Sequence, residues 1–160
     1  MEKNKDWFNL FKEPNIEGFP SWMRIPEFGM NYENSYVNIV TESKFFDDLF
    51  VTHISEKSYR PFFYYQLPMI LATQYHIKTM KEKYNFDFFD DIINHSYDNE
   101  PNQMRRLEMF VEEIKRLDGI QDQVKEFYKN NKQRFEDNKQ KVWNMLNIVE
   151  KDYQFFESLI

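Results

Sequence analysis

Apolar and polar residues alternate in two short stretches of the chain that predict strands. Residues 36–41, YVNIVT, alternate and are rich in β-branched side chains, which is typical of a β-strand. Residues 68–72, PMILA, form a brief apolar run that ends at polar residues, the pattern of a strand buried on both faces of a parallel sheet. Because the segment between these stretches carries a helical pattern, their order predicts a βαβ unit.

Two helices are predicted beside these strands. The segment 55–65 opens with a serine that suits a helix N-cap, and it contains Pro61, which predicts a short or kinked helix. Residues 74–84 repeat apolar side chains at helical spacing and predict a second helix. Residues 86–89, FDFF, fit either a short strand or a packed turn.

The C-terminal third, about residues 101–160, predicts helices. An amphipathic helix ends near Gly119, and a second helical region follows it. Apolar residues become sparse over residues 129–141, so a break near Asn130 and one long projecting helix both fit the pattern. The apolar stripe over residues 142–160 has steps of three and four, which predicts packing on the domain or, as a second use, contact with a partner.

The chain is predicted to hold one domain behind an irregular start. Its 160 residues have the length of a single hydrophobic core. Residues 1–34 contain three of the six prolines and two of the three glycines, so we expect an irregular lead-in there. Residues 35–160 are then one α/β domain, with a short parallel Rossmann-like sheet, flanking helices and a helical C-terminal third.

Composition narrows the classes of function. The chain has 21 Lys and Arg against 27 Asp and Glu, a net charge of -6, so we expect no binding to nucleic acid. Aromatic residues make up 19% of the chain, which is enough to build a substantial core. There is no cysteine, which suits a reducing compartment, and we expect the cytoplasm. No apolar stretch approaches the ~20 residues of a membrane span, and the start lacks the apolar region of a signal peptide.

The most informative chemistry lies in one block of the chain. Thr-Glu-Ser at 41–43 follows the first predicted strand, Ser-Glu-Lys-Ser-Tyr-Arg-Pro occupies 55–61, and the second strand comes next. This order resembles the C-terminal, donor-binding half of GT-B glycosyltransferases, especially fucosyltransferase-like proteins and their phage-encoded relatives. The segment 86–101 is similar to one that those phage proteins carry before their terminal helices. The resemblance covers roughly residues 31–117.

The resemblance implies a donor site for a nucleotide-sugar, GDP- or UDP-linked, as the substrate. A carboxylate accepts hydrogen bonds from ribose hydroxyls, while a cation and the amides of a helix N-terminus hold the diphosphate. No catalytic residue, resident cofactor or metal is assigned, and a phage-encoded protein would act in the host cytoplasm. By resemblance, Glu56 binds the ribose, Lys57 and Arg60 bind the diphosphate, and Glu42, Ser43 and Ser55 line the site.

Two departures from the family pattern suggest another function. A GT-B enzyme works in the cleft between two halves, so this chain is expected to need a separate acceptor-domain polypeptide for sugar transfer. The family's glycines near the second strand are replaced here by Gln66-Leu67 and by residues 73–75, which restricts close approach to a phosphate. The alternative is a non-catalytic interaction or assembly protein that forms a homo-oligomer through its C-terminal helices.

The histidines suggest no chemistry of their own. His53, His76 and His95 lack the spacing of a metal motif, and single histidines of this kind are expected to be surface or hydrogen-bonded structural residues. His95-Ser96 sits in no nucleophile motif and is predicted to form a turn.

Overall fold

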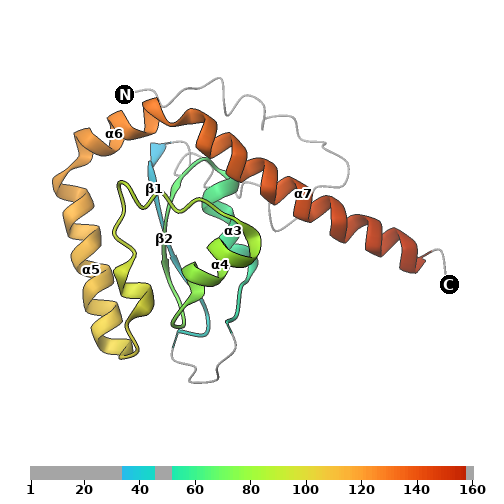
Figure 1. The fold of residues 1–160 in the computed structure, drawn as a ribbon, viewed down its shortest axis with the longest axis horizontal. Coiled ribbons are helices and arrows are strands. Elements are labelled where there is room, and N and C mark those ends of the chain that lie inside the picture. The colour runs from blue at the N-terminus through green and yellow to red at the C-terminus, as the bar shows by residue number, and fades with distance from the viewer. Residues whose placement is uncertain (1–33, 46–51, 158–160) are drawn as a thin grey trace.

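A computed structural model describes residues 34–45 and 52–157 of the chain (Figure 1). For residues 146–157 it describes the helical backbone but not the side chains. The predicted lead-in therefore lies, apart from Asn34, outside the described residues. The described elements are β1 (Val37–Thr41), α3 (Glu56–Phe63), β2 (Leu67–Leu71), α4 (His76–Tyr84), the short 3-10 helix η2 (Ser96–Asn99), α5 (Gln103–Gly119), α6 (Gln121–Asn130) and α7 (Lys132–Glu157).

The two strands form a parallel pair, as predicted. Val37 lies opposite Leu67 and Thr41 opposite Leu71, and the residues between them pair in the same register. All five residues of β2 are buried, which agrees with its continuous apolar sequence. Helix α3 connects the strands, so the βαβ unit and the α/β class are confirmed.

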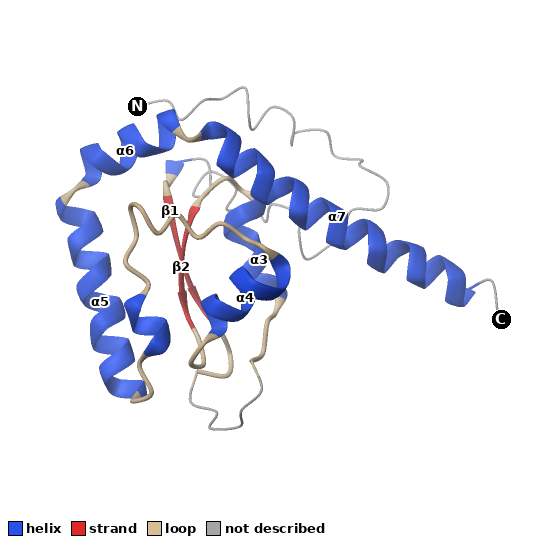
Figure 2. Cartoon of the chain, viewed as in Figure 1, coloured by secondary structure: helices blue, strands red, loops and turns tan. Residues whose placement is uncertain are grey.

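The sheet lies between two layers of helices (Figure 2). Helices α3 and α4 cover one face, and α5 with α6 covers the other. Successive side chains of a strand point to opposite faces, so each layer meets alternate residues of β1. Val40 and Glu42 are buried on the side of α3, whereas Val37 and Ile39 point toward α5 and α6.

Helix α3 is short for local reasons that the sequence contains. The Ser55 side chain caps it and accepts a hydrogen bond from the Lys57 backbone N–H at 3.3 Å. Pro61 lies inside the helix, which ends two residues later at Phe63. The predicted short helix is confirmed, and its buried Phe62 and Phe63 join the core.

The segment after α4 is a packed turn and not a strand. Phe86, Phe88 and Phe89 are all buried. The ring of Phe86 stacks on Phe62 with centroids 4.5 Å apart, and the ring of Phe89 stacks on Phe135 of α7 at 4.4 Å. Of the two alternatives that the sequence left open for 86–89, the packed turn is confirmed.

The helical C-terminal third is also confirmed, with both a break and a long helix. Helix α6 ends at Asn130, and α7 runs for 26 residues beyond the break, extending past the rest of the domain in Figure 1. Polar side chains fix the start of α7: Arg134 pairs with Asp87 at 2.7 Å and with Asp91 at 2.7 Å. The stripe that begins at Val142 is buried at that residue, and most of it lies outside the described side chains.

Candidate functional site

The predicted donor site falls at the carboxyl ends of both strands, where open α/β sheets bind their ligands. Glu42 and Ser43 directly follow β1, and Ser55, Glu56 and Lys57 begin α3. The structure therefore brings the two halves of the sequence motif together at one edge of the sheet. The orientation of the side chains decides what this edge can bind.

The Glu42 carboxylate is turned into the protein. It is only 4% exposed, although it follows an edge strand. Its two oxygens accept hydrogen bonds from Ser55 Oγ at 2.9 and 2.7 Å, and one oxygen accepts from the Ser55 backbone N–H at 3.2 Å. Ser58 Oγ donates to the same carboxylate from the next turn of α3. Glu42 therefore occupies the start of α3, where the diphosphate was predicted to bind.

A histidine from α4 completes this cluster. The Nε2 atom of His76 lies 2.9 Å from Ser58 Oγ, and both side chains are fully buried. Because the one proton of the Ser58 hydroxyl goes to Glu42, His76 must donate to that oxygen through Nε2–H. The other ring nitrogen, Nδ1, makes no hydrogen bond of ordinary geometry. Glu42, Ser55, Ser58 and His76 are called the Glu42 cluster below.

The Glu42 cluster holds one negative charge at neutral pH. Burial alone would raise the pKa of Glu42, but the hydrogen bonds from Ser58 and Ser55 together outweigh it and hold the pKa below its ordinary value. Burial lowers the pKa of His76 to about 4, and the nearby Glu42 charge offsets only part of that effect. The carboxylate is therefore ionised and the imidazole neutral at pH 7.

A second carboxylate lies at the start of α4 and bonds to the helix backbone directly. Asp98, from η2, accepts hydrogen bonds from the backbone N–H groups of Ile77 and Lys78, each at 2.9 Å. Its side chain supplies the negative charge that a helix N-terminus favours. Both helices that begin at this edge thus have a carboxylate of the protein itself at their first turn. A bound diphosphate would have to displace Glu42 or Asp98.

The remaining predicted site residues lie nearer the surface. Lys57 Nζ donates to Ser43 Oγ at 3.1 Å in an exposed contact. Glu56 and Arg60 lie in the first and last turns of α3 and are half-buried. Between described residues, no side-chain hydrogen bond joins Glu56 or Arg60 to Ser43 or Lys57. The roles predicted for the six residues stay predictions.

The Glu42 cluster contains the residue types of a hydrolytic triad but not its geometry. A triad needs a serine that gives its proton to histidine and a carboxylate that orients that histidine. Here the carboxylate and the histidine both contact Ser58, and the serine donates to Glu42. No substrate atom reaches Ser58 or His76, since each is 0% exposed. The cluster fixes β1, α3 and α4 to one another.

Sequence reasoning missed Ser58, His76 and Asp98. Ser58 offered a weak signal, because it lies three residues after Ser55 and so on the same side of α3. His76 and Asp98 offered none, since their partners lie 18 to 21 residues away along the chain.

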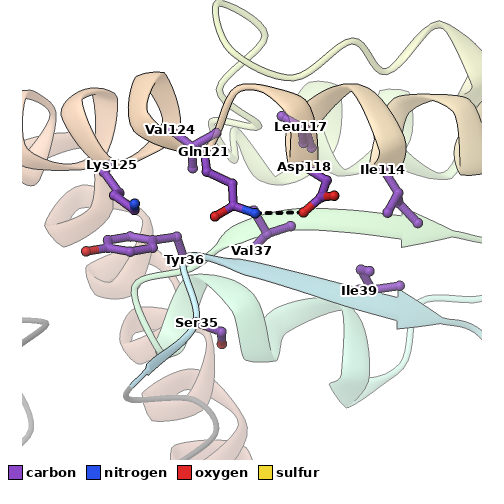
Figure 3. Close-up of a pocket in the computed structure, with 10 residues that line it drawn as sticks. All are labelled: Ser35, Tyr36, Val37, Ile39, Ile114, Leu117, Asp118, Gln121, Val124 and Lys125. Atoms are coloured by element: carbon purple, nitrogen blue, oxygen red, sulfur yellow. Dashed lines mark hydrogen bonds between the residues drawn. The ribbon is translucent and has the colours of Figure 1, made fainter. Parts of the chain in front are cut away.

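An apolar groove lies elsewhere in the described structure, on the side of α5 and α6 (Figure 3). This groove has a volume of about 270 Å³. In Figure 3 the side chains of Ile39 on β1 and Ile114 on α5 project into the space between strand and helix. Ile39 is 53% exposed, which is high for a large apolar strand residue. The groove is lined by Ser35, Tyr36, Val37, Ile39, Ile114, Leu117, Asp118, Gln121, Val124 and Lys125, and by no residue of β2.

The outer edge of β1 borders this groove. At the two ends of the ladder Leu67 N–H donates to Tyr36 O, and Glu42 N–H donates to Leu71 O. Since parallel pairing uses the backbone of alternate residues, β2 takes the even-numbered positions of β1. The N–H and C=O groups of Val37, Ile39 and Thr41 then point outward. Within residues 34–45 and 52–157, no strand pairs with them.

Between Val37 and Thr41 this edge carries no charged side chain and no proline, although the strand is short and the inward-turned Glu42 follows it. Monomeric proteins block such edges with lysine, proline, a bulge or a charge that points inward. The strand reads VNIVT and contains no charged residue and no proline. An open, uncharged edge beside an apolar groove is therefore the most accessible recognition feature in the described part of the protein.

Comparison of the chain with protein-family models, with curated proteins and with solved structures finds no match. The glycosyltransferase resemblance accordingly remains a prediction from the residues. Among the described residues, no group of histidine and carboxylate side chains is arranged to hold a metal ion. Nor does any described helix combine the length and the apolar composition needed to cross a bilayer.

Proposed function

We propose that this protein is a non-catalytic interaction domain that binds another polypeptide along the open edge of β1. The observation that carries the proposal is the outward backbone of Val37, Ile39 and Thr41 directly beside the apolar groove. An extended chain bound there gains main-chain hydrogen bonds from the edge, and its alternate side chains enter the groove. This is the mode of recognition called β-strand addition.

The state of the strand ends supports the same proposal. Asp98 already accepts hydrogen bonds from the first-turn N–H groups of α4, and Glu42 places its charge at the N-cap of α3 through hydrogen bonds from Ser55. These are the positions where a donor diphosphate would bind. The replacement of the expected glycines by Gln66-Leu67 and by residues 73–75 also argues against diphosphate binding. The chemistry of the donor site is thus used within the protein, while no strand among the described residues pairs with the edge of β1.

Panning a library of random 12-residue peptides displayed on phage tests this proposal. We expect enrichment of peptides that alternate apolar and polar residues, because only alternate side chains face the groove. Ile39→Lys places a charge at the groove and should lower the affinity of enriched peptides at least tenfold. Glu82→Gln is the matched control, since it changes the net charge by the same +1, here by removal of a negative charge, but lies on α4 with Lys78 as its partner. Peptides that bind Ile39→Lys equally well would refute the proposal, as would a lack of enrichment at a protein concentration where the chain is monomeric.

The second candidate function is binding of a nucleotide-sugar for transfer by a separate acceptor polypeptide. The exposed contact between Lys57 Nζ and Ser43 Oγ favours it, because it leaves a cation and a hydroxyl at the carboxyl edge of the sheet. GDP, UDP, CDP and their sugars would be tested by thermal shift, since a ligand at about 100 times its dissociation constant adds about 2.7 kcal/mol of stability. A shift for one nucleotide that Lys57→Ala abolishes would support this function. No shift at millimolar ligand would leave the interaction domain.

A further inference from the structure

We infer that the partner for the open edge of β1 is a second copy of this chain, paired antiparallel about a two-fold axis that passes beside Ile39. The inference rests on the proposed function, since it names the occupant of the same edge. It would join two two-stranded sheets into one four-stranded sheet with the order β2-β1-β1-β2.

The free backbone groups of β1 are arranged symmetrically about Ile39. Val37 and Thr41 lie two residues to either side of it, and all three residues point their N–H and C=O groups outward. A two-fold axis therefore pairs Ile39 with Ile39 of the second copy, and Val37 with Thr41. In an antiparallel ladder each such pair exchanges two hydrogen bonds, so about six would form. An edge that matches itself in this way is what an isologous dimer requires.

Exposed apolar side chains extend along the same side of the molecule. Directly opposed residues in a sheet point to the same face, so the two Ile39 side chains would pack against each other at the mouths of both grooves. On α5, Val111 lies one turn before the groove residue Ile114, and Met104 lies two turns before Val111 on the same flank of the helix. Val111 is 37% and Met104 58% exposed. A second copy would remove these side chains and Ile39 from water together.

Charge and stability favour a second copy over an unrelated strand. Each chain has a net charge of -6, but β1 itself is uncharged, so pairing along this strand opposes no like charges between Val37 and Thr41. A two-stranded sheet is marginal by itself, and both copies present the same unfinished sheet. Pairing of the β-branched Val37 with Thr41, and of Ile39 with itself, suits a cross-strand ladder.

The molar mass of the full chain at increasing concentration is the first measurement. Analytical ultracentrifugation from ~1 to ~300 μM should show a monomer converting to a dimer. Ile39→Lys should weaken the dimer at least tenfold, and Glu82→Gln should leave it unchanged. Circular dichroism checks that both variants keep the helical fold.

A cysteine cross-link tests the register without a disruptive substitution. The chain contains no cysteine, so Ile39→Cys introduces a single thiol. Opposed residues of a hydrogen-bonded antiparallel pair have Cα atoms about 5.5 Å apart, a distance that a disulfide spans. We expect Ile39→Cys to form a covalent dimer on mild oxidation. Thr41→Cys is the control, since its two copies would lie at least ~13 Å apart in this register.

The outcomes separate this inference from the proposed function. A chain that stays monomeric at all concentrations but still binds library peptides at the β1 edge would overturn the dimer and leave the interaction domain standing. A dimer that Ile39→Lys does not weaken, or one that Thr41→Cys cross-links more readily than Ile39→Cys, would overturn this pairing. A wild-type chain that neither dimerises nor binds library peptides would overturn both proposals.

Discussion

The two sides of β1 contrast sharply, although one strand of five residues forms both. On the α3 side Val40 is packed in the core, and Glu42 is held by hydrogen bonds from Ser55 and Ser58. On the α5 side Ile39 is half-exposed at an open groove. Glu42, a carboxylate at the end of a parallel strand, would be expected to bind a ligand but here stabilises the fold. The apolar Ile39 lies instead at the accessible surface.

The largest loss of stability is expected from a substitution in the Glu42 cluster, on the α3 side of β1. Glu42→Ala would leave the hydroxyl groups of Ser55 and Ser58 without their shared acceptor. Since each buried donor left without a partner costs about 1 to 3 kcal/mol, we expect the free energy of unfolding to fall by about 4 kcal/mol. Urea denaturation followed by circular dichroism would measure it. Thr41→Ala is the neighbouring control on an exposed residue, and equal small losses in both variants would show that the cluster does not close this side.

The pH dependence of stability tests the same cluster with a somewhat smaller effect. The unfolded chain binds a proton at His76 near pH 6.5, whereas the folded protein binds it only near pH 4. Between these values the unfolded state holds more protons, so stability is full above pH 6.5 and is lost as the pH falls toward 4. We expect a loss of roughly 3 kcal/mol from His76, with a similar contribution from the buried His95, whose pKa burial also lowers to about 4.

The variant His76→Gln isolates the part of this pH dependence that belongs to the Glu42 cluster. It removes the titrating imidazole while it keeps an amide that can donate to Ser58. Urea unfolding at pH 7.5 and at pH 5 should therefore show a smaller difference in the variant than in the wild-type protein. A slope that His76→Gln leaves unchanged would mean that other groups cause the acid sensitivity.

The smallest effect is expected from two neighbouring residues of β1, and it compares the two sides directly. Val40→Ala removes two buried methyl groups and should cost about 2 kcal/mol. Ile39→Ala removes more carbon atoms from an exposed position and should change stability by no more than about 0.5 kcal/mol. The measurement requires a protein concentration at which the chain is monomeric. A larger loss for Ile39→Ala would mean that the α5 side is closed in solution.

The local pattern of the sequence predicted the elements well. Both strands and helix α3 fall within about two residues of their expected positions, because alternation, the Ser55 cap and Pro61 act over a few residues. The helix predicted to end near Gly119 has Gly119 as its last residue. The choice between strand and turn at 86–89 was open because stacking of Phe86 on Phe62 and of Phe89 on Phe135 depends on distant segments.

The candidate site was predicted less well, because the sequence does not show in which direction the Glu42 side chain points. The motif did place Glu42 beside Ser55 and Ser43 beside Lys57, since a βαβ unit brings a strand end to the start of its following helix. It did not show that Glu42 points inward. That outcome depends on His76 and Ser58, which meet across 18 residues.

The sequence by itself determined the α/β class, the parallel pair and the helical C-terminal third, because propensity, capping and apolar period act over short distances. The tertiary structure alone decided which polar groups are available to a ligand. A buried carboxylate needs several hydrogen-bond donors at once, and Glu42 finds them on α3, which Ser58 and His76 join to α4. The tertiary structure also decided that, within the described residues, no strand pairs with the outer edge of β1 and that an apolar groove lies between β1 and helices α5 and α6.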